Sequence, residues 1–274
     1  MRHRPPIVVA LLLLVATSSH EDAAASSQAD DLASELDDLA SGHADPKVVA
    51  ALVRTVSGSA RQAGTRAVAS GRWLASTFVD VAPRIRVRDL EMLKEHHGGL
   101  EGADLAEALV RNAARASAAV GATSGAIVSA QYAAPPTWLA LPVELAAETL
   151  AIAVIELKLV AELHEAYGRP VRGTAGERTV ALVKAWAERR GVTARTLAKP
   201  GGLGEALGRG TRNELVRMVQ RRLLARLGRN VSTLAPMFAG AVIAGEVNRR
   251  GTRALGDAVV RDLAAAAATS LPPG

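Results

Sequence analysis

The sequence predicts an all-α protein, a multi-helix bundle around a long central helical hairpin with no sheet. Apolar residues make up 49% of the 274 residues but aromatic residues only 3%, so aliphatic side chains on packed helices must supply most of the core. No segment shows the two-residue apolar alternation, bounded by turn residues, that marks a β-strand. Long helical patterns lie instead on both sides of Pro135 and Pro136, which favours a hairpin of two helices.

The predicted hairpin runs from Asp104 to Gly168 and contains no charged residue between Arg115 and Glu144. Small residues are frequent in this stretch, and they let helix backbones approach closely. The same small-residue spacing recurs later in the chain, where Asn248 is suited to helix capping or to an interhelical hydrogen bond. We therefore predict close helix packing at Gly121, Gly125, Ala241, Gly245 and Asn248.

Charged residues interrupt the second helix of the hairpin. Glu148 and Glu156 lie among Leu, Ala, Ile and Val, where a carboxylate must reach water, pair with a cation or take up a proton. Arg111 and Arg115 on the preceding helix are the candidate partners of Glu148 or Glu144. The alternatives are a solvated stripe and a metal or acid–base site, although this helix contains neither HExxH nor the Glu-x-x-His pattern of di-iron bundles. The predicted ion-pair or polar cluster consists of Arg111, Arg115, Glu144, Glu148, Glu156, Lys158, Glu162 and His164.

The net charge of +6 favours an anionic partner such as a lipid surface or a nucleic acid. Residues 211–229 form an amphipathic helical pattern with arginines opposite its Leu and Val residues. This helix can bind an anionic membrane, or it can dock its apolar face on the core and leave the arginines in water. Nucleic-acid binding is the weaker alternative, because no aromatic platform or recognition motif accompanies the charge. The candidate anion-binding residues are Arg217, Arg221, Arg222, Arg226 and Arg229.

The chain divides into four segments by composition. Residues 1–25 have the layout of a secretory signal, with a basic start, an apolar stretch and a small-residue site, or else form a disordered tail. Residues 26–44 are an acidic tail rich in Ala and Ser, with too little apolar surface to dock strongly. Residues 45–268 form the helical domain, and residues 269–274 a disordered C-terminus. The chain has no cysteine, which excludes disulfides and thiolate metal sites.

Four stretches of the chain carry a family resemblance. They are DLEMLKEHHGGL from Asp89, RNAARASAAVGATSGAI from Arg111, LPVELAAETLAIAVIELKLVAELHEAYG from Leu141 and APMFAGAVIAGEVNRRGTRALGDAV from Ala235. Together they resemble the EcsC family of bacterial proteins, in its actinobacterial form, and the resemblance is strongest over residues 87–263. It implies a hydrophobic helical protein, named for a component that is encoded with an ABC transporter and affects protein secretion. It implies no catalytic residues.

Three classes of function follow from these patterns. The first is a non-enzymatic, membrane-associated or transporter-linked protein, in the cytoplasm or at the cytoplasmic membrane, or exported if residues 1–25 are a functional signal. The second is an enzyme or metal-binding bundle that uses the carboxylates of residues 142–168, which would have to converge in a pocket. The third is non-specific nucleic-acid binding through residues 211–229. We expect the first class, with an anionic membrane surface or an ABC transporter as partner and with no cofactor, metal or catalytic residue; oligomeric state and insertion of the uncharged helices into lipid stay open.

Overall fold

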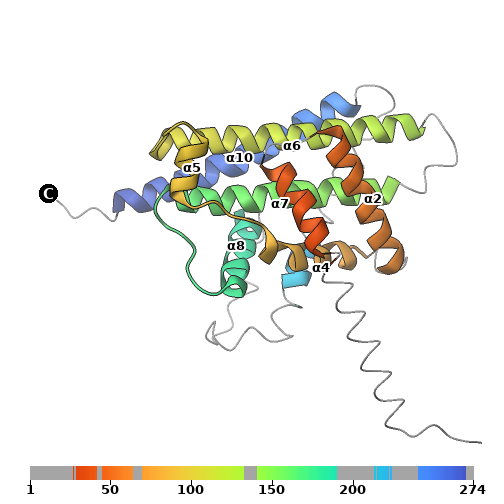
Figure 1. Ribbon diagram of the computed structural model, residues 1–274, viewed down its shortest axis with the longest axis horizontal. Helices are drawn as coiled ribbons and strands as arrows, with labels where there is room; N and C mark the ends of the chain where they lie inside the picture. Colours follow the sequence, from red (N-terminus) through yellow and green to blue (C-terminus); the bar gives the residue numbers. More distant parts are fainter. Residues whose placement is uncertain are drawn as a thin grey trace, which may run out of the picture.

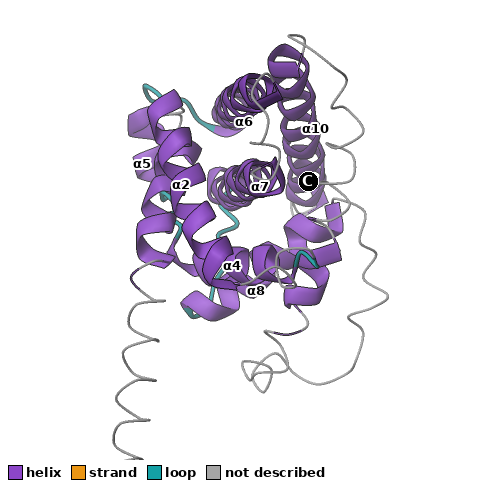
Figure 2. Ribbon diagram, turned by 90° about the vertical axis from the view of Figure 1, so that its right-hand side faces the viewer, coloured by secondary structure: helices purple, strands orange, loops and turns teal. Residues whose placement is uncertain are grey.

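The computed structural model of the protein describes residues 27, 29–41, 45–63, 70–132, 141–189, 213, 215–221, 223 and 240–269. In this part of the chain every regular element is a helix, which confirms the predicted all-α bundle (Figure 2). The signal-like residues 1–25 lie outside the described residues, as does the predicted C-terminal tail apart from Thr269. The labelled elements are α2 (Pro46–Ala63), α4 (Arg72–Val81), the 3-10 helix η1 (Ala82–Arg84), α5 (Leu90–His96), α6 (Gly102–Tyr132), α7 (Leu141–Ala166), α8 (Ala175–Arg189) and α10 (Gly240–Thr269). Further helical residues lie at 29–40 and 215–221.

Helix α7 is the axis around which the other helices pack (Figure 1). Every side chain from residue 145 to residue 163 is buried. Helices α6 and α10 lie on one side of α7, and α2, α4, α5 and α8 also contact it. A helix covered on all sides needs apolar residues around its whole circumference, and α7 has them. The second arm of the predicted hairpin is therefore the centre of the bundle.

Helices α6 and α10 form the most extensive helix pair in the described residues, larger than the pair of hairpin arms. A Cβ atom on Gly121 would lie 2.3 Å from Asn248 Nδ2 and 2.8 Å from the carbonyl oxygen of Ala244. A Cβ atom on Gly245 would lie 2.9 Å from the carbonyl oxygen of Ala118. Real Cβ atoms do not come this close to other atoms, so glycine is required at both positions. The predicted close packing at Gly121 and Gly245 is confirmed.

The same helix pair includes a contact that the sequence did not indicate. A Cβ atom on Gly256 of α10 would lie 2.6 Å from a methyl group of Val110 on α6. Gly125 is half-buried on α6, and the side chain of Ala241 lies outside the described residues. The close approach of α6 and α10 therefore continues well beyond the predicted small-residue spacings.

The described part of the acidic segment, residues 29–41, is an integral part of the core and not a weakly docked tail. Three leucines that share one face of its helix are buried: Leu32, Leu36 and Leu39. Asp37 on the same helix pairs with the buried Lys158 of α7. The prediction that this segment docks weakly is therefore wrong, because leucines spaced four and three apart supply an apolar stripe in spite of the acidic composition.

Local sequence signals fix several helix ends. The Asp89 carboxylate accepts a hydrogen bond from the Met92 backbone N–H (2.9 Å) and so caps α5. Before α8, Thr174 and Glu177 form a capping box, in which the Glu177 backbone N–H donates to the Thr174 hydroxyl oxygen. The backbone N–H and the hydroxyl of Thr174 both donate to Glu177 Oε2, and these two hydrogen bonds lower the pKa of the Glu177 carboxyl. Gly168 adopts the left-handed conformation (φ 62°) just after α7, where a residue with a Cβ would be strained.

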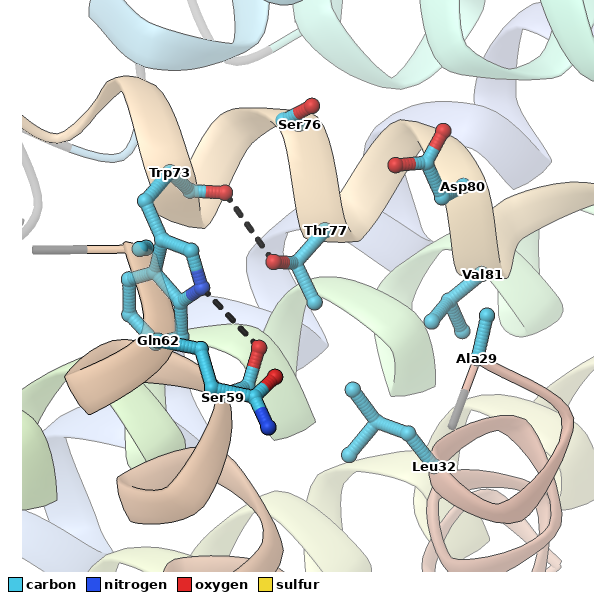
Figure 3. A pocket seen from close by; sticks show the side chains of 10 residues that line it. Ala29, Leu32, Ser59, Gln62, Trp73, Ser76, Thr77, Asp80 and Val81 are labelled. Carbon is cyan, nitrogen blue, oxygen red and sulfur yellow. Dashed lines mark hydrogen bonds between the residues drawn. The ribbon is translucent and has the colours of Figure 1, made fainter. Parts of the chain in front are cut away.

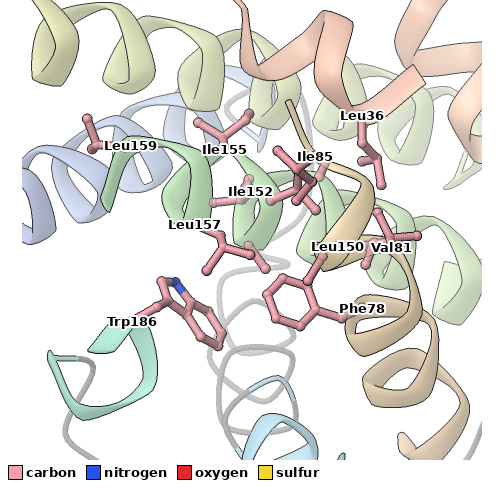
Figure 4. Packing of buried hydrophobic residues seen from close by; sticks show 14 of the residues in the cluster. Leu36, Phe78, Val81, Ile85, Leu150, Ile152, Ile155, Leu157, Leu159 and Trp186 are labelled. Atoms are coloured by element: carbon pink, nitrogen blue, oxygen red, sulfur yellow. The ribbon is translucent and has the colours of Figure 1, made fainter. Parts of the chain in front are cut away.

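Two aromatic side chains anchor the core between α4, α7 and α8 (Figure 4). The rings of Phe78 and Trp186 lie with their centroids 5.3 Å apart and their planes tilted by 34°. Both side chains are buried, and Leu150 and Leu157 of α7 lie beside them. Aromatic pairs at this distance contribute stabilisation beyond their buried area, so two rings partly offset the low aromatic content.

Candidate functional site

Helix α10 has an inner face that holds it on the bundle and an outer face that it presents to solvent. The inner face carries Gly245, Asn248 and Thr252, which are all buried. We define the outer face of α10 as seven residues that fall within about 160° of the helix circumference: Val242, Ile243, Glu246, Val247, Arg249, Arg250 and Arg253. The contacts of the inner face fix the position of α10 on the bundle, and so determine which of its residues face the solvent.

The amide of Asn248 joins α10 to α7. Its Nδ2 atom donates to Glu148 Oε1 at 2.6 Å, and both side chains are buried, with Glu148 only 6% exposed. Gly121 of α6 makes room for this amide, because any side chain there would collide with Nδ2. The interhelical hydrogen bond that the sequence suggested for Asn248 is therefore present, and a glycine on a third helix permits it.

A second connection lies two turns further along α7, at the fully buried Glu156. The indole Nε1–H of Trp186 donates to Glu156 Oε2 at 3.0 Å. The hydroxyl of Thr252 lies 3.3 Å from Glu156 Oε1 and 2.8 Å from the hydroxyl of Ser117 on α6. We call Ser117, Glu148, Glu156, Trp186, Asn248 and Thr252 the neutral-donor cluster, because neutral groups donate to its two carboxylates.

Near the C-terminal end of α7 the buried charges are paired with opposite charges. Arg88 donates two hydrogen bonds of 2.8 Å to the Glu162 carboxylate, from Nε to Oε1 and from Nη2 to Oε2. These hydrogen bonds raise the pKa of the Arg88 guanidinium. Lys158 Nζ donates to Asp37 Oδ1 at 2.5 Å and to the backbone carbonyl of Arg86 at 2.7 Å, and lies 3.9 Å from Glu162 Oε1. We call Asp37, Arg88, Lys158 and Glu162 the ion-pair cluster. It ties the segment 29–41 and the chain before α5 to α7.

The predicted partners of Glu148 are not the observed ones. Arg111 and Arg115 are exposed on α6, while Glu148 is buried against α10. The expected pairing of either arginine with Glu148 is therefore wrong, because the inward face of α6 is the one that carries the small residues. The side chain of Glu144 lies outside the described residues, and His164 is half-buried.

Four residues of the predicted polar cluster thus fall into two clusters: Glu148 and Glu156 in the neutral-donor cluster, and Lys158 and Glu162 in the ion-pair cluster. In the described part of the chain, no three His, Asp or Glu side chains come together in a way that could hold a metal ion. Glu148, Glu156 and Glu162 are each held by a donor from a different element, namely α10, α8 and the chain before α5. An acid–base or metal site needs such groups to converge on one point, whereas Glu148, Glu156 and Glu162 follow one another at intervals of roughly 9–12 Å along the axis of α7.

The arginine-rich helix docks on the core. Within residues 213–223, the described apolar side chains are buried: Leu215, Val216, Met218, Val219 and Leu223. Arg217 and Arg221 are exposed, whereas Arg222, Arg226 and Arg229 lie outside the described residues. Of the two predicted arrangements, docking of the apolar face on the protein is confirmed for this part of the helix. An apolar face packed in the core cannot also lie in lipid.

The outer face of α10 begins with exposed apolar side chains. Val242 is 75% exposed, Val247 47% and Ile243 42%. Arginines follow on the same face from Arg249, roughly 10 Å along the helix axis from Val242 and roughly 3 Å from Val247. Sequence reasoning missed this face, although the order of Val, Ile and Val before three arginines was visible, because the higher density of arginines in residues 211–229 favoured that segment.

Two glutamates moderate the charge of this face. Arg249 and Arg250 both pair with Glu246, at 2.7 and 2.5 Å, and these hydrogen bonds lower the pKa of the Glu246 carboxyl to about 2. Arg253 pairs with Glu107 of α6 at 2.7 Å. Glu246 stays ionised at neutral pH, so three arginines and two glutamates leave a net formal charge of +1.

Two polar side chains of the uncharged stretch of α6 point into the bundle. Ser117 and Ser124 are 0% and 2% exposed, so a helix partner and not lipid surrounds them. Among the described residues, no helix is both long enough and apolar enough to cross a bilayer.

No family model, curated protein or solved structure matches the chain.

Proposed function

We propose that this chain is a non-enzymatic helical protein that binds the anionic surface of the cytoplasmic membrane through the outer face of α10. The observation that carries the proposal is the order of side chains along that face. Val242, Ile243 and Val247 are exposed at the start of the helix, and Arg249 and Arg250 follow within two turns. Apolar side chains that enter the boundary between headgroups and acyl chains, with arginines at the level of the phosphates, are typical of peripheral membrane binding.

The apolar residues dominate the energetics of the proposed binding. Transfer of three branched side chains from water contributes roughly 2–4 kcal/mol in total, because each is already partly covered. Arginines near an anionic surface add attraction. Glu246 and Glu107 offset two of the three arginines, so this addition is modest. The arginines then serve mainly to favour anionic over zwitterionic lipid and to orient the helix.

The EcsC resemblance supports the same setting. It implies a component encoded with an ABC transporter, and we extend the proposal to a transporter at that membrane as the protein partner. Contact with lipid through the α10 end leaves the faces formed by α5, α8 and the segment 29–41 available for a protein partner. The proposal requires no cofactor and no catalytic residue.

Vesicle flotation tests the lipid contact directly. The purified full chain is mixed with phosphatidylcholine vesicles that contain or lack phosphatidylglycerol. We expect binding to the anionic vesicles, and we expect the double substitution Val242→Asp/Val247→Asp to reduce the bound fraction by about tenfold. Replacement of Arg249 and Arg250 by Gln should cause a smaller loss.

Met92→Asp is the matched control, because Met92 on α5 is 43% exposed, close to the exposure of Ile243 and Val247. It should leave flotation unchanged. Unchanged flotation of the double variant, or no binding of the wild-type chain to anionic vesicles, would contradict the proposal. In cells, a C-terminally tagged chain should stay in the membrane pellet through a high-salt wash and leave it at high pH.

A further inference from the structure

A cavity of about 340 Å³ opens between the segment 29–41, the end of α2 and α4 (Figure 3). Small-molecule pockets in proteins usually measure roughly 300–1,000 Å³, so this cavity is large enough for a small ligand. Its described lining includes Ala29 and Leu32 but no residue of α10. A ligand here is therefore independent of the proposed membrane contact and depends on the docked segment 29–41.

The inner wall of the cavity is apolar. Leu32, Trp73 and Val81 line it, and they are 2%, 7% and 0% exposed to solvent. The indole Nε1–H of Trp73 is already engaged, because it donates to the Ser59 hydroxyl at 3.1 Å (Figure 3). This hydrogen bond holds the indole ring in place, so the ring presents a fixed apolar surface to a ligand.

The charge of the lining is directed away from the cavity. Among the described residues that line it, Asp80 is the one with an ionisable side chain. Figure 3 shows the Asp80 carboxylate on the side of α4 that is turned away from Trp73 and Leu32. A charged group that entered the cavity would lose water without meeting an opposite charge, which is unfavourable. The cavity therefore favours a neutral ligand.

Two polar side chains of α2, one turn apart, lie on the cavity side of that helix, opposite Leu32 (Figure 3). The half-buried Ser59 hydroxyl accepts from Trp73, and its own O–H donates to no group in the part of the chain that the structure describes. Gln62 is exposed at the rim, where its carboxamide makes no hydrogen bond to the described residues. The two side chains thus present hydrogen-bond donors together with the acceptor oxygen of Gln62. A carboxamide on the ligand matches them, because it also carries both kinds of group.

We propose that this cavity binds a small neutral carboxamide with an aromatic or branched apolar body. The apolar body packs on Trp73 and Leu32. The amide oxygen accepts from the Ser59 hydroxyl, and the amide group exchanges hydrogen bonds with the Gln62 carboxamide. Because the ligand contacts Leu32 on one side and α4 on the other, it stabilises the docked position of the segment 29–41 by mass action.

Calorimetric titration of the full chain with phenylacetamide tests the proposal, with two charged compounds of similar shape, phenylacetate and phenethylamine, for comparison. At neutral pH we expect saturable binding of the amide, at least about tenfold tighter than that of either ion, because each ion loses water without gaining an opposite charge. The amide should also raise the melting temperature of the protein, since the cavity exists only in the folded chain. Equal affinity for the amide and either ion, or no binding of any of the three compounds, would overturn the proposal.

One variant tests the polar contact. Gln62→Leu keeps the approximate size of the side chain and removes its carboxamide, so it should weaken amide binding by about fivefold, the effect of losing roughly one net hydrogen bond. Asn213→Leu is the matched control, because it removes an exposed carboxamide outside the lining and should leave amide binding unchanged. Unaltered amide binding in folded Gln62→Leu would overturn the assignment of the amide group to α2.

A second variant tests the location. Ala63 is exposed at the rim, and Ala63→Phe places a ring over the opening. It should weaken amide binding while the far-ultraviolet circular dichroism stays that of the wild type. Unaltered amide binding in Ala63→Phe would overturn the location.

Discussion

Helix α7 buries three carboxylates, Glu148, Glu156 and Glu162, and the side chains seen to donate to them are of two kinds. In the neutral-donor cluster, Glu148 and Glu156 accept hydrogen bonds from an amide and an indole. In the ion-pair cluster, Glu162 faces the guanidinium of Arg88 and the ammonium of Lys158. The neutral-donor cluster joins helices to one another. The ion-pair cluster joins the segment 29–41 and the chain before α5 to α7.

The difference follows from what packs against α7 beside each cluster. Helix α10 approaches α6 so closely that only small or compact polar side chains fit between them, which favours Asn and Thr as donors. The chain before α5 and the segment 29–41 lie at the edge of the bundle, where the long side chain of Arg88 can reach inward from a partly exposed position. Close packing thus selects neutral donors, and the periphery admits ions.

Removal of the ammonium group from the ion-pair cluster should lower the free energy of unfolding more than the other substitutions. Lys158→Met leaves the Asp37 carboxylate without its cation and the Arg86 carbonyl without its donor. We expect the free energy of unfolding to fall by about 3 kcal/mol, the low end for a broken buried pair, because Asp37 is partly exposed and can recruit water. Urea denaturation followed by circular dichroism measures the change.

Two further variants decide whether the loss comes from the broken pair. Lys94→Met removes a lysine whose partners Glu91 and Glu101 are exposed, and should have little effect. The double variant Lys158→Met/Asp37→Leu replaces both charges by apolar groups and should recover much of the stability. A double variant no more stable than Lys158→Met would contradict the role assigned to the ion-pair cluster.

The neutral-donor cluster should be broken by a single methyl group. In Gly121→Ala the new Cβ would lie 2.3 Å from Asn248 Nδ2 and 2.8 Å from the Ala244 carbonyl oxygen, so α10 must shift and the bond to Glu148 must lengthen. We expect a loss of about 2 kcal/mol, from overpacking and from a weakened hydrogen bond to a buried carboxylate. Thermal unfolding measures this loss.

Gly58→Ala in α2 is the matched control for that substitution. Nothing lies within 4 Å of a Cβ at Gly58, so the change there reports helix propensity alone. It should stabilise the protein by about 0.5–1 kcal/mol. The two glycine-to-alanine variants should therefore move the melting temperature in opposite directions, and a rise in both would show that α6 and α10 can separate without loss.

The neutral-donor cluster and the ion-pair cluster also differ in how far the sequence predicts their contacts. Glycine and asparagine spacing indicated the contacts of Gly121, Gly245 and Asn248, because close helix crossings demand particular small residues. The partners of Lys158 and Glu162 could not be predicted in this way. They lie 121 and 74 residues away, on Asp37 and Arg88, and charged side chains of several types can fill such positions.

Composition misled the prediction in one region and obscured the candidate site in another. The acidic composition of residues 26–44 hid the leucine stripe that docks this segment. The density of arginines in residues 211–229 favoured an anion-binding surface there, whereas exposed apolar residues and arginines occur together on the outer face of α10. The neighbouring helices decide which face of an amphipathic helix stays exposed. A helical wheel shows only the residues of the helix itself, so it cannot predict that face.

Substitution of Glu35 should change the stability of the protein least. Glu35 also contrasts with Asp37 on the same helix, whose carboxylate pairs with Lys158. Its Oε1 accepts a hydrogen bond from the Thr55 hydroxyl at 3.1 Å, while Oε2 has no hydrogen-bond partner in the described part of the chain. Burial raises the pKa of the Glu35 carboxyl, and the negative charge of Asp31 acts in the same direction.

A raised folded-state pKa means that the folded protein holds the Glu35 proton more tightly than the unfolded chain does. The contribution of Glu35 to stability is therefore greatest at low pH and is lost as the pH rises above the ordinary glutamate value of 4.5 through the folded-state pKa. Glu35→Gln keeps an oxygen for the Thr55 hydroxyl and removes the titration. Its melting temperature should exceed that of the wild type at neutral pH and match it below the ordinary value; a variant less stable at neutral pH would mean that the Glu35 charge is compensated as well as that of Asp37.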